Sequence, residues 1–210
     1  MTTDSDEDVS ANLAFVKALV SEGGRSQMAG GAAFLTGGLC YGVQCVLNWL
    51  QIKGWLPGGA PAALFIGIAP TVIFAVILTI ILWRERKNGH QGVATRALNA
   101  AFGSAGLANL FIMVVFAYNA YVENSLKTWL FYPCMVCALQ GAVWYIAYMI
   151  RKKLWLAFAS GGWFLATLAL GLNVRDTPTY LLILGLALLL LMGGSGAYMM
   201  YRSRQEGNAA

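Results

Sequence analysis

Residues 61–83 read PAALFIGIAPTVIFAVILTIILW, and the charged run Arg84-Glu85-Arg86-Lys87 follows them directly. This stretch contains no Asp, Glu, Lys, Arg or His. An α-helix of roughly 20 apolar residues, rising 1.5 Å per residue, crosses the hydrocarbon core of a bilayer, which is roughly 30 Å thick. The stretch therefore predicts a helix that spans a membrane.

The same pattern recurs along the chain, which is 59% hydrophobic and only 11% charged. Soluble domains usually carry about 25% charged residues. We expect transmembrane helices near residues 30–50, 61–83, 97–119, 128–149, 154–173 and 177–200. The fold class predicted is an all-α integral membrane protein with six transmembrane helices. Its expected partners therefore include the lipid bilayer.

The domain organisation follows from these spans. We expect residues 1–27 to form an N-terminal tail, residues 28–202 a six-helix transmembrane domain, and residues 203–210 a C-terminal tail. No loop is long enough for a soluble catalytic or DNA-binding domain, and the basic clusters are too short for a nucleic-acid surface. Nucleic-acid binding is therefore not expected.

Basic residues predict the orientation, because Lys and Arg in short loops remain in the cytoplasm. Eleven lie on one predicted side: Lys17, Arg25, Arg84, Arg86, Lys87, Arg96, Arg151, Lys152, Lys153, Arg202 and Arg204. Three lie on the other: Lys53, Lys127 and Arg175. Both termini are therefore expected in the cytoplasm. The general pattern is similar to that of short six-helix bacterial inner-membrane proteins, which implies that location.

The N-terminal tail begins with acidic residues and continues as an amphipathic segment at residues 11–22. Leu13, Val16 and Val20 share one side of a helix drawn through this segment. Such a helix either lies in the cytoplasmic membrane interface or binds a protein partner. Both interpretations remain open at this stage.

A short pattern, A-F-x-[ST]-[GA]-G-[LW], occurs at residues 33–39, 101–107 and 157–163. Each copy lies in the predicted cytoplasmic half of an odd-numbered helix. Each even-numbered helix has a proline at its predicted outer start, namely Pro61, Pro133 and Pro178. These features indicate three repeated helical hairpins whose odd-numbered helices meet at the centre of the bundle.

Small residues allow helix backbones to approach closely in lipid, where no hydrophobic gain drives helices together. On this basis we expect helix packing through ten positions: Gly37, Gly38, Gly42, Ala101, Ala105, Gly106, Gly161, Gly162, Gly193 and Ala197.

Chemistry-bearing residues are scarce within the predicted spans. They contain no ionisable Asp, Glu or His, which proton-coupled transporters usually retain. The chain also has no phosphate-binding loop, dinucleotide fingerprint or metal-spaced His/Glu motif. We therefore expect neither an enzyme nor a cofactor. Five amides within the spans are candidates for a polar cavity: Gln44, Asn48, Asn99, Asn109 and Gln140.

The cysteines are the only candidate reactive set. Cys134 and Cys137 share a helical face, and Cys45 is predicted at a similar depth in the outer half of the membrane. A thiol cluster of this kind would suit a soft metal or disulfide exchange. Free cysteine is also a common small apolar packing residue, and on that simpler interpretation no metal is expected.

Three functional hypotheses remain from the sequence. The leading hypothesis is a non-enzymatic membrane protein that works through a membrane-protein partner or a homo-oligomer, as a sensor, regulator or accessory subunit. The first alternative is a small transporter or channel for a neutral or apolar solute. The second is a membrane thiol redox or metal-binding protein.

Overall fold

The computed structural model describes the backbone of residues 3–85 and 93–208 and the side chains of residues 27–59, 61–84 and 93–205. The described residues are almost entirely helical. The helices are α1 (Thr3–Ile52), α2 (Ala60–Glu85), α3 (Val93–Val122), α4 (Leu126–Arg151), α5 (Leu154–Leu172), α6 (Thr177–Ala187) and α7 (Ser195–Asn208). A π-helical segment, η1 (Leu188–Gly194), joins α6 to α7 without a break.

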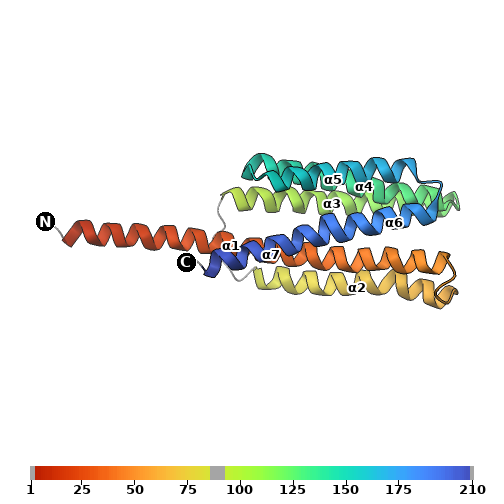
Figure 1. Ribbon diagram of the computed structural model, residues 1–210, viewed down its shortest axis with the longest axis horizontal. Helices are drawn as coiled ribbons and strands as arrows, with labels where there is room; N and C mark the ends of the chain where they lie inside the picture. Colours follow the sequence, from red (N-terminus) through yellow and green to blue (C-terminus); the bar gives the residue numbers. More distant parts are fainter. Residues whose placement is uncertain (1–2, 86–92, 209–210) are drawn as a thin grey trace.

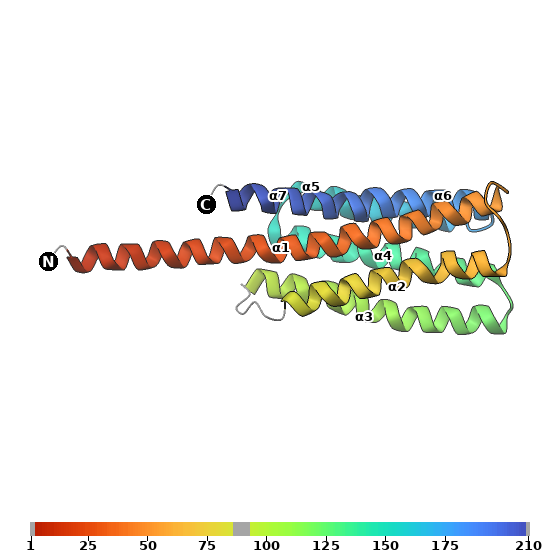
Figure 2. The same ribbon diagram turned by 90° about the horizontal axis from the view of Figure 1, so that it is seen from below.

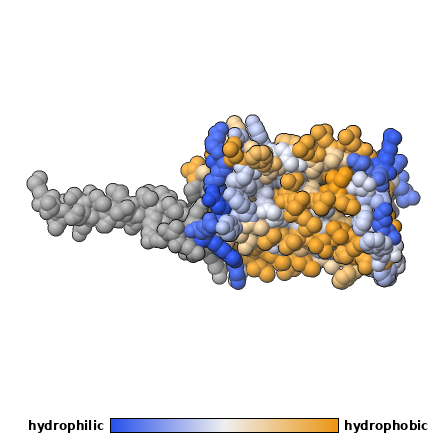
Figure 3. All heavy atoms as spheres, viewed as in Figure 1, coloured by the Kyte–Doolittle hydropathy of each residue, from blue (hydrophilic) through white to orange (hydrophobic). Residues whose placement is uncertain are grey.

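The prediction of six membrane-spanning helices is confirmed. Helical segments long and apolar enough to cross a bilayer run over Gln27–Ile52, Pro61–Arg84, Val93–Val122, Leu126–Arg151, Leu154–Leu172 and Thr177–Gln205. Figure 3 shows an apolar belt around the middle of the bundle, with hydrophilic residues gathered at both ends. This surface fits a multi-pass protein whose middle is surrounded by lipid.

The bundle consists of two layers (Figures 1 and 2). In the first layer α1 packs between α2 and the continuous α6–η1–α7 helix. In the second layer α4 packs between α3 and α5. The layers meet where α5 contacts α6 and η1. The helices at the centres of the two layers are therefore α1 and α4.

This arrangement contradicts the predicted convergence of the odd-numbered helices. The third hairpin is split, because α5 belongs to the layer of α4 while α6 packs on α1. The three repeat phenylalanines also differ in their surroundings. Phe34 and Phe102 contact each other, with ring centroids 5.1 Å apart, whereas Phe158 is 79% exposed. The predicted convergence was wrong and the threefold repeat is not confirmed, because a local pattern of small residues does not specify which helix packs against it.

The helix starts differ in part from expectation. Pro178 lies in the first turn of α6, where its missing N–H costs nothing. Pro133, however, lies inside α4, which begins earlier at Leu126 and is capped by the Ser125 side chain accepting from the Thr128 N–H. The start of α4 is therefore set by the N-cap residue Ser125 and not by Pro133.

The first helix is much longer than the span it contains. It runs unbroken from Thr3 to Ile52, and the membrane-spanning part begins at Gln27. In Figure 1 its N-terminal part projects beyond the bundle at the end where the C-terminus also lies. At the same end Arg151 donates from Nη1 to Gln27 Oε1, 3.3 Å away, and so links α4 to α1.

Candidate functional site

Glycines bring the backbones of α1 and the α6–η1–α7 helix together. A Cβ added at Gly38 would lie 2.3 Å from the backbone nitrogen of Gly193. A Cβ added at Gly196 would lie 2.3 Å from the nitrogen of Leu35, and one at Gly31 would lie 2.8 Å from the Gly196 carbonyl oxygen. Since any side chain at these points would overlap a backbone, this interface depends on glycine.

Some of the predicted packing positions lie in such contacts and others do not. Gly37, Gly38 and Gly42 pack against η1 or its flanks, and Gly162 packs on Leu191. Gly193 is buried at the same interface. By contrast, an added Cβ at Gly106 or Gly161 would meet nothing within 4 Å.

The remaining positions also differ from expectation. Ala197 is exposed, while Ala101 and Ala105 are only partly buried. The packing role assigned to Gly106, Gly161 and Ala197 is therefore wrong. Sequence reasoning missed Gly31, Gly185 and Gly196, although Gly31, Gly38 and Gly42 follow the spacing of seven and four that places residues on one helical face.

The Ser and Thr hydroxyls of the three pattern copies bond in two different ways. Thr36 Oγ1 donates to the Ala32 carbonyl at 2.8 Å, and Ser104 Oγ donates to the Ala101 carbonyl at 2.9 Å. Ser160 Oγ instead donates across to the Gly141 carbonyl on α4, at 2.8 Å. Only Ser160 therefore links two helices.

A cluster of aromatic rings fills the space between the layers. Trp144 on α4 lies within ring-contact distance of Phe34 (5.1 Å), Phe102 (5.6 Å) and Trp155 (5.7 Å). Trp155 continues the chain of contacts to Tyr198, 5.0 Å away. Five helices thus contribute to one cluster. Trp155 on α5 links this cluster to α7.

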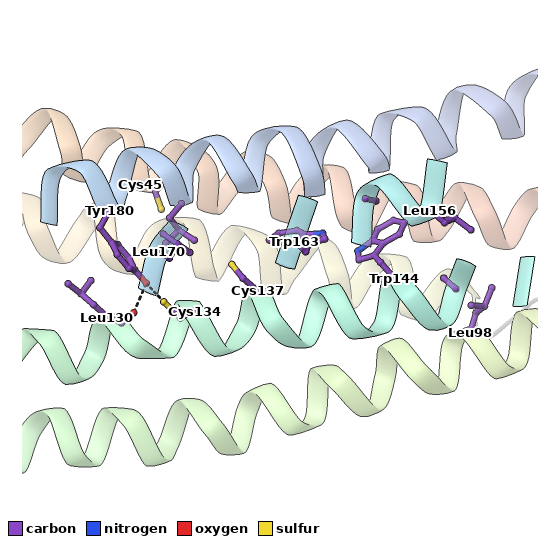
Figure 4. Packing of buried hydrophobic residues seen from close by; sticks show 13 residues of the cluster. Cys45, Leu98, Leu130, Cys134, Cys137, Trp144, Leu156, Trp163, Leu170 and Tyr180 are labelled. Atoms are coloured by element: carbon purple, nitrogen blue, oxygen red, sulfur yellow. Dashed lines mark hydrogen bonds between the residues drawn. The ribbon is translucent and has the colours of Figure 1, made fainter. Parts of the chain in front are cut away.

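The centre of the bundle contains two fully buried tryptophans, Trp144 and Trp163, each 1% exposed (Figure 4). Their indole Nε1–H groups have no hydrogen-bond partner among the described residues. The Oε1 atom of Gln140, one turn from Trp144 on α4, is buried and also lacks a partner there. These polar atoms lie in an otherwise apolar interior.

The predicted amide cavity is not reproduced as one group. Gln44 Nε2 donates to the Gly67 carbonyl, 3.2 Å away, and so joins α1 to α2. Asn99 is exposed, and Asn48 is partly buried. Asn109 and Gln140 are partly buried, with one unpartnered buried oxygen each. Gln44 and Asn99 therefore do not line an interior cavity, because one serves the α1–α2 contact and the other faces outward.

Three of the four cysteines lie in the buried core. Cys45, Cys134 and Cys137 are buried, and Figure 4 shows them near Tyr180. Cys134 Sγ is 3.6 Å from the Tyr180 hydroxyl, which donates to the Leu130 carbonyl. Among residues 27–59, 61–84 and 93–205, whose side chains the structure describes, no group of three or more His, Cys, Asp or Glu side chains is placed to hold a metal ion.

Comparison of this chain with known protein families, curated proteins and solved structures finds no match. Its site must therefore be interpreted from its own geometry. That geometry comprises a glycine interface continuous with the long first helix, an aromatic cluster between the layers, and a small group of unpartnered polar atoms at the centre.

Proposed function

We propose that this chain is a non-enzymatic membrane protein that acts through a protein partner bound to residues 3–26 of α1, here called the α1 extension. The observation that carries the proposal is the continuity of α1 from Thr3 to Ile52. An unbroken helix is stiff, so a displacement at one end is transmitted along it. The extension is in this way coupled to the membrane core.

The α1 extension is coupled to one particular element of the bundle, the α6–η1–α7 helix. Gly31, Gly38 and Gly42 of α1 pack directly against the α6–η1–α7 helix. Backbones in such close contact have little freedom to adjust independently. A partner that tilts or rotates the α1 extension would thus also displace the α6–η1–α7 helix.

The sequence of the extension suggests the kind of partner. Its first residues are acidic, and Leu13, Val16 and Val20 recur on one helical side. An apolar stripe of this kind binds a hydrophobic groove on another protein. We also propose a bacterial inner-membrane location with both termini in the cytoplasm, which is supported by the excess of Lys and Arg on the predicted cytoplasmic side and is consistent with the two ends of the chain lying at one end of the bundle.

The transporter alternative draws less support. The amides predicted to line a polar cavity have different surroundings. Gln44 donates a hydrogen bond to the Gly67 carbonyl, whereas Asn99 faces outward. The largest fully buried side chains, Trp144, Trp163 and Tyr180, fill the interior between the layers. A thiol redox or metal function is also less supported, because the thiols are packed in the core.

The test is purification of the full-length protein from its native membranes after mild cross-linking. We expect a stoichiometric second protein cross-linked to residues 3–26. Substituting Ser at Leu13, Val16 and Val20 should abolish that cross-link while the thermal unfolding of the bundle is unchanged. The matched control substitutes Ser at Ala11 and Ala18 and Gln at Glu22, which lie on the opposite side at about 100° per residue, and should retain it. A homo-oligomer alone, unaffected by either variant, would refute the proposal.

A further inference from the structure

The chemistry at the centre of the α4–α5 pair is unusual for a membrane interior. The Ser160 hydroxyl bonds the Gly141 carbonyl and so fixes the register of the two antiparallel helices. Trp144 comes three residues after Gly141 on α4, and Trp163 comes three residues after Ser160 on α5. The two tryptophans therefore lie on opposite sides of this hydrogen bond along the bundle axis.

Helix geometry turns the two indoles toward each other. Side chains on a helix lean toward its N-terminus. Because α4 and α5 are antiparallel, Trp144 leans back toward the level of Gly141, and Trp163 leans back toward the level of Ser160. Figure 4 shows this directly, since the nitrogen atoms lie at the ends of the two indoles that face each other.

Neither indole N–H group has a hydrogen-bond partner among the described residues, and each tryptophan lies three residues from one end of the Ser160–Gly141 bond. Burying such a donor unpaired destabilises a protein, and buried tryptophan N–H groups usually find an acceptor. Gln140, beside Gly141 at the same level of α4, adds an unpartnered buried oxygen. One O–H group can accept from both indoles and donate to this oxygen.

We propose that one small neutral molecule lies between the indole nitrogens of Trp144 and Trp163 and binds both through a single O–H oxygen. Neutrality follows from the surroundings: the buried cluster around the site consists of Trp, Leu, Ala, Cys and Tyr side chains, and a charged group would be costly there. Small size follows from enclosure, because both tryptophans are 1% exposed. The chemistry suits an internal water or the hydroxyl of a membrane-dissolved molecule.

The test uses nuclear magnetic resonance of the full-length protein, labelled with ¹⁵N at the tryptophan indoles, in phosphatidylcholine nanodiscs. Trp144→Phe and Trp163→Phe assign the two central signals, and exposed Trp55 provides the reference. We expect both central Hε1 signals to be shifted downfield as hydrogen-bonded protons. Cross-peaks to water protons identify an internal water. Cross-peaks to aliphatic protons that disappear after the protein is stripped of lipid identify a membrane-dissolved hydroxyl.

A shared acceptor predicts coupling between the two indoles. Trp144→Phe should shift the Trp163 signal, and the reverse substitution should shift the Trp144 signal, whereas Trp129→Phe at the outer end should move neither. Central signals at the position of non-bonded indoles in the wild-type protein would overturn the proposal without any variant. So would a downfield shift that is lost in Ser160→Ala with no cross-peak to a third molecule, because the indoles would then bond Ser160 itself.

Discussion

Gly38 and Gly193 lie so close that a Cβ on Gly38 would come within 2.3 Å of the Gly193 backbone nitrogen and 2.6 Å of its Cα. Neither atom belongs to a movable side chain, so the overlap can be relieved only by separating the helices. The pair also marks where η1 contacts α1, since the Leu188 carbonyl oxygen would lie 2.8 Å from the same Cβ. Two glycines thus set the distance between α1 and the α6–η1–α7 helix.

Gly38→Ala should destabilise the bundle by about 1–3 kcal/mol, the usual cost of an extra methyl group in a packed interior. Gly106→Ala is the matched control, because an added Cβ there meets nothing within 4 Å. Thermal unfolding in detergent should show a clear loss for the first variant and none for the second. Equal losses would contradict the glycine interface.

Tyr180→Phe should lower the free energy of unfolding by about 1–2 kcal/mol, because it removes a buried hydrogen bond to the Leu130 carbonyl. Tyr180 is fully buried, and the bond joins α6 to α4 across the layers. Tyr145→Phe, at a position 51% exposed, should cost little. The comparison requires denaturant titration of both variants, and an unchanged Tyr180→Phe midpoint would exclude a stabilising role for this bond.

The four cysteines should differ in their reaction with membrane-permeant N-ethylmaleimide. Cys40 is partly exposed, whereas Cys45, Cys134 and Cys137 are buried. We expect Cys40 to be modified first and the other three only after unfolding, as measured by mass spectrometry of the intact protein. Rapid modification of Cys134 or Cys137 in the folded protein would indicate a reactive thiol site and revive the redox hypothesis.

Reporter fusions test the orientation. Fusions after residues 27, 90, 152 and 205 should report a cytoplasmic location, and those near residues 56, 124 and 175 an external one, because basic residues favour the cytoplasmic side. The measurement is the paired activity of a phosphatase reporter and a fluorescent reporter at each position. An external signal at residue 90 would reverse the assignment.

The spans could be predicted from the sequence because membrane crossing is a local property. Residues 61–83 are long and apolar enough to cross a bilayer whatever they pack against, and α2 indeed runs from Ala60 to Glu85. The start of α4 also has a local cause, because the Ser125 side chain caps the helix before Pro133 is reached.

The pairing of helices was not predictable in the same way. Gly38, Gly106 and Gly162 occupy equivalent positions in the sequence pattern, yet their surroundings differ. Gly38 lies against the backbone of Gly193, Gly162 lies against the Leu191 side chain, and Gly106 has nothing within 4 Å of an added Cβ. Small residues permit close approach but do not choose the approaching helix, because their contribution is the absence of a side chain. The choice depends on the shape of both surfaces.

The sequence by itself thus determined six membrane-spanning helices and favoured one orientation, since both follow from how each segment interacts with lipid, water and the membrane interface. Only the tertiary structure decided that α1 packs on the α6–η1–α7 helix and that Trp144 and Trp163 face each other beside the Ser160–Gly141 bond. These relationships depend on the register between helices distant in sequence. Register is fixed by interlocking side chains and backbones in three dimensions, which no single segment encodes.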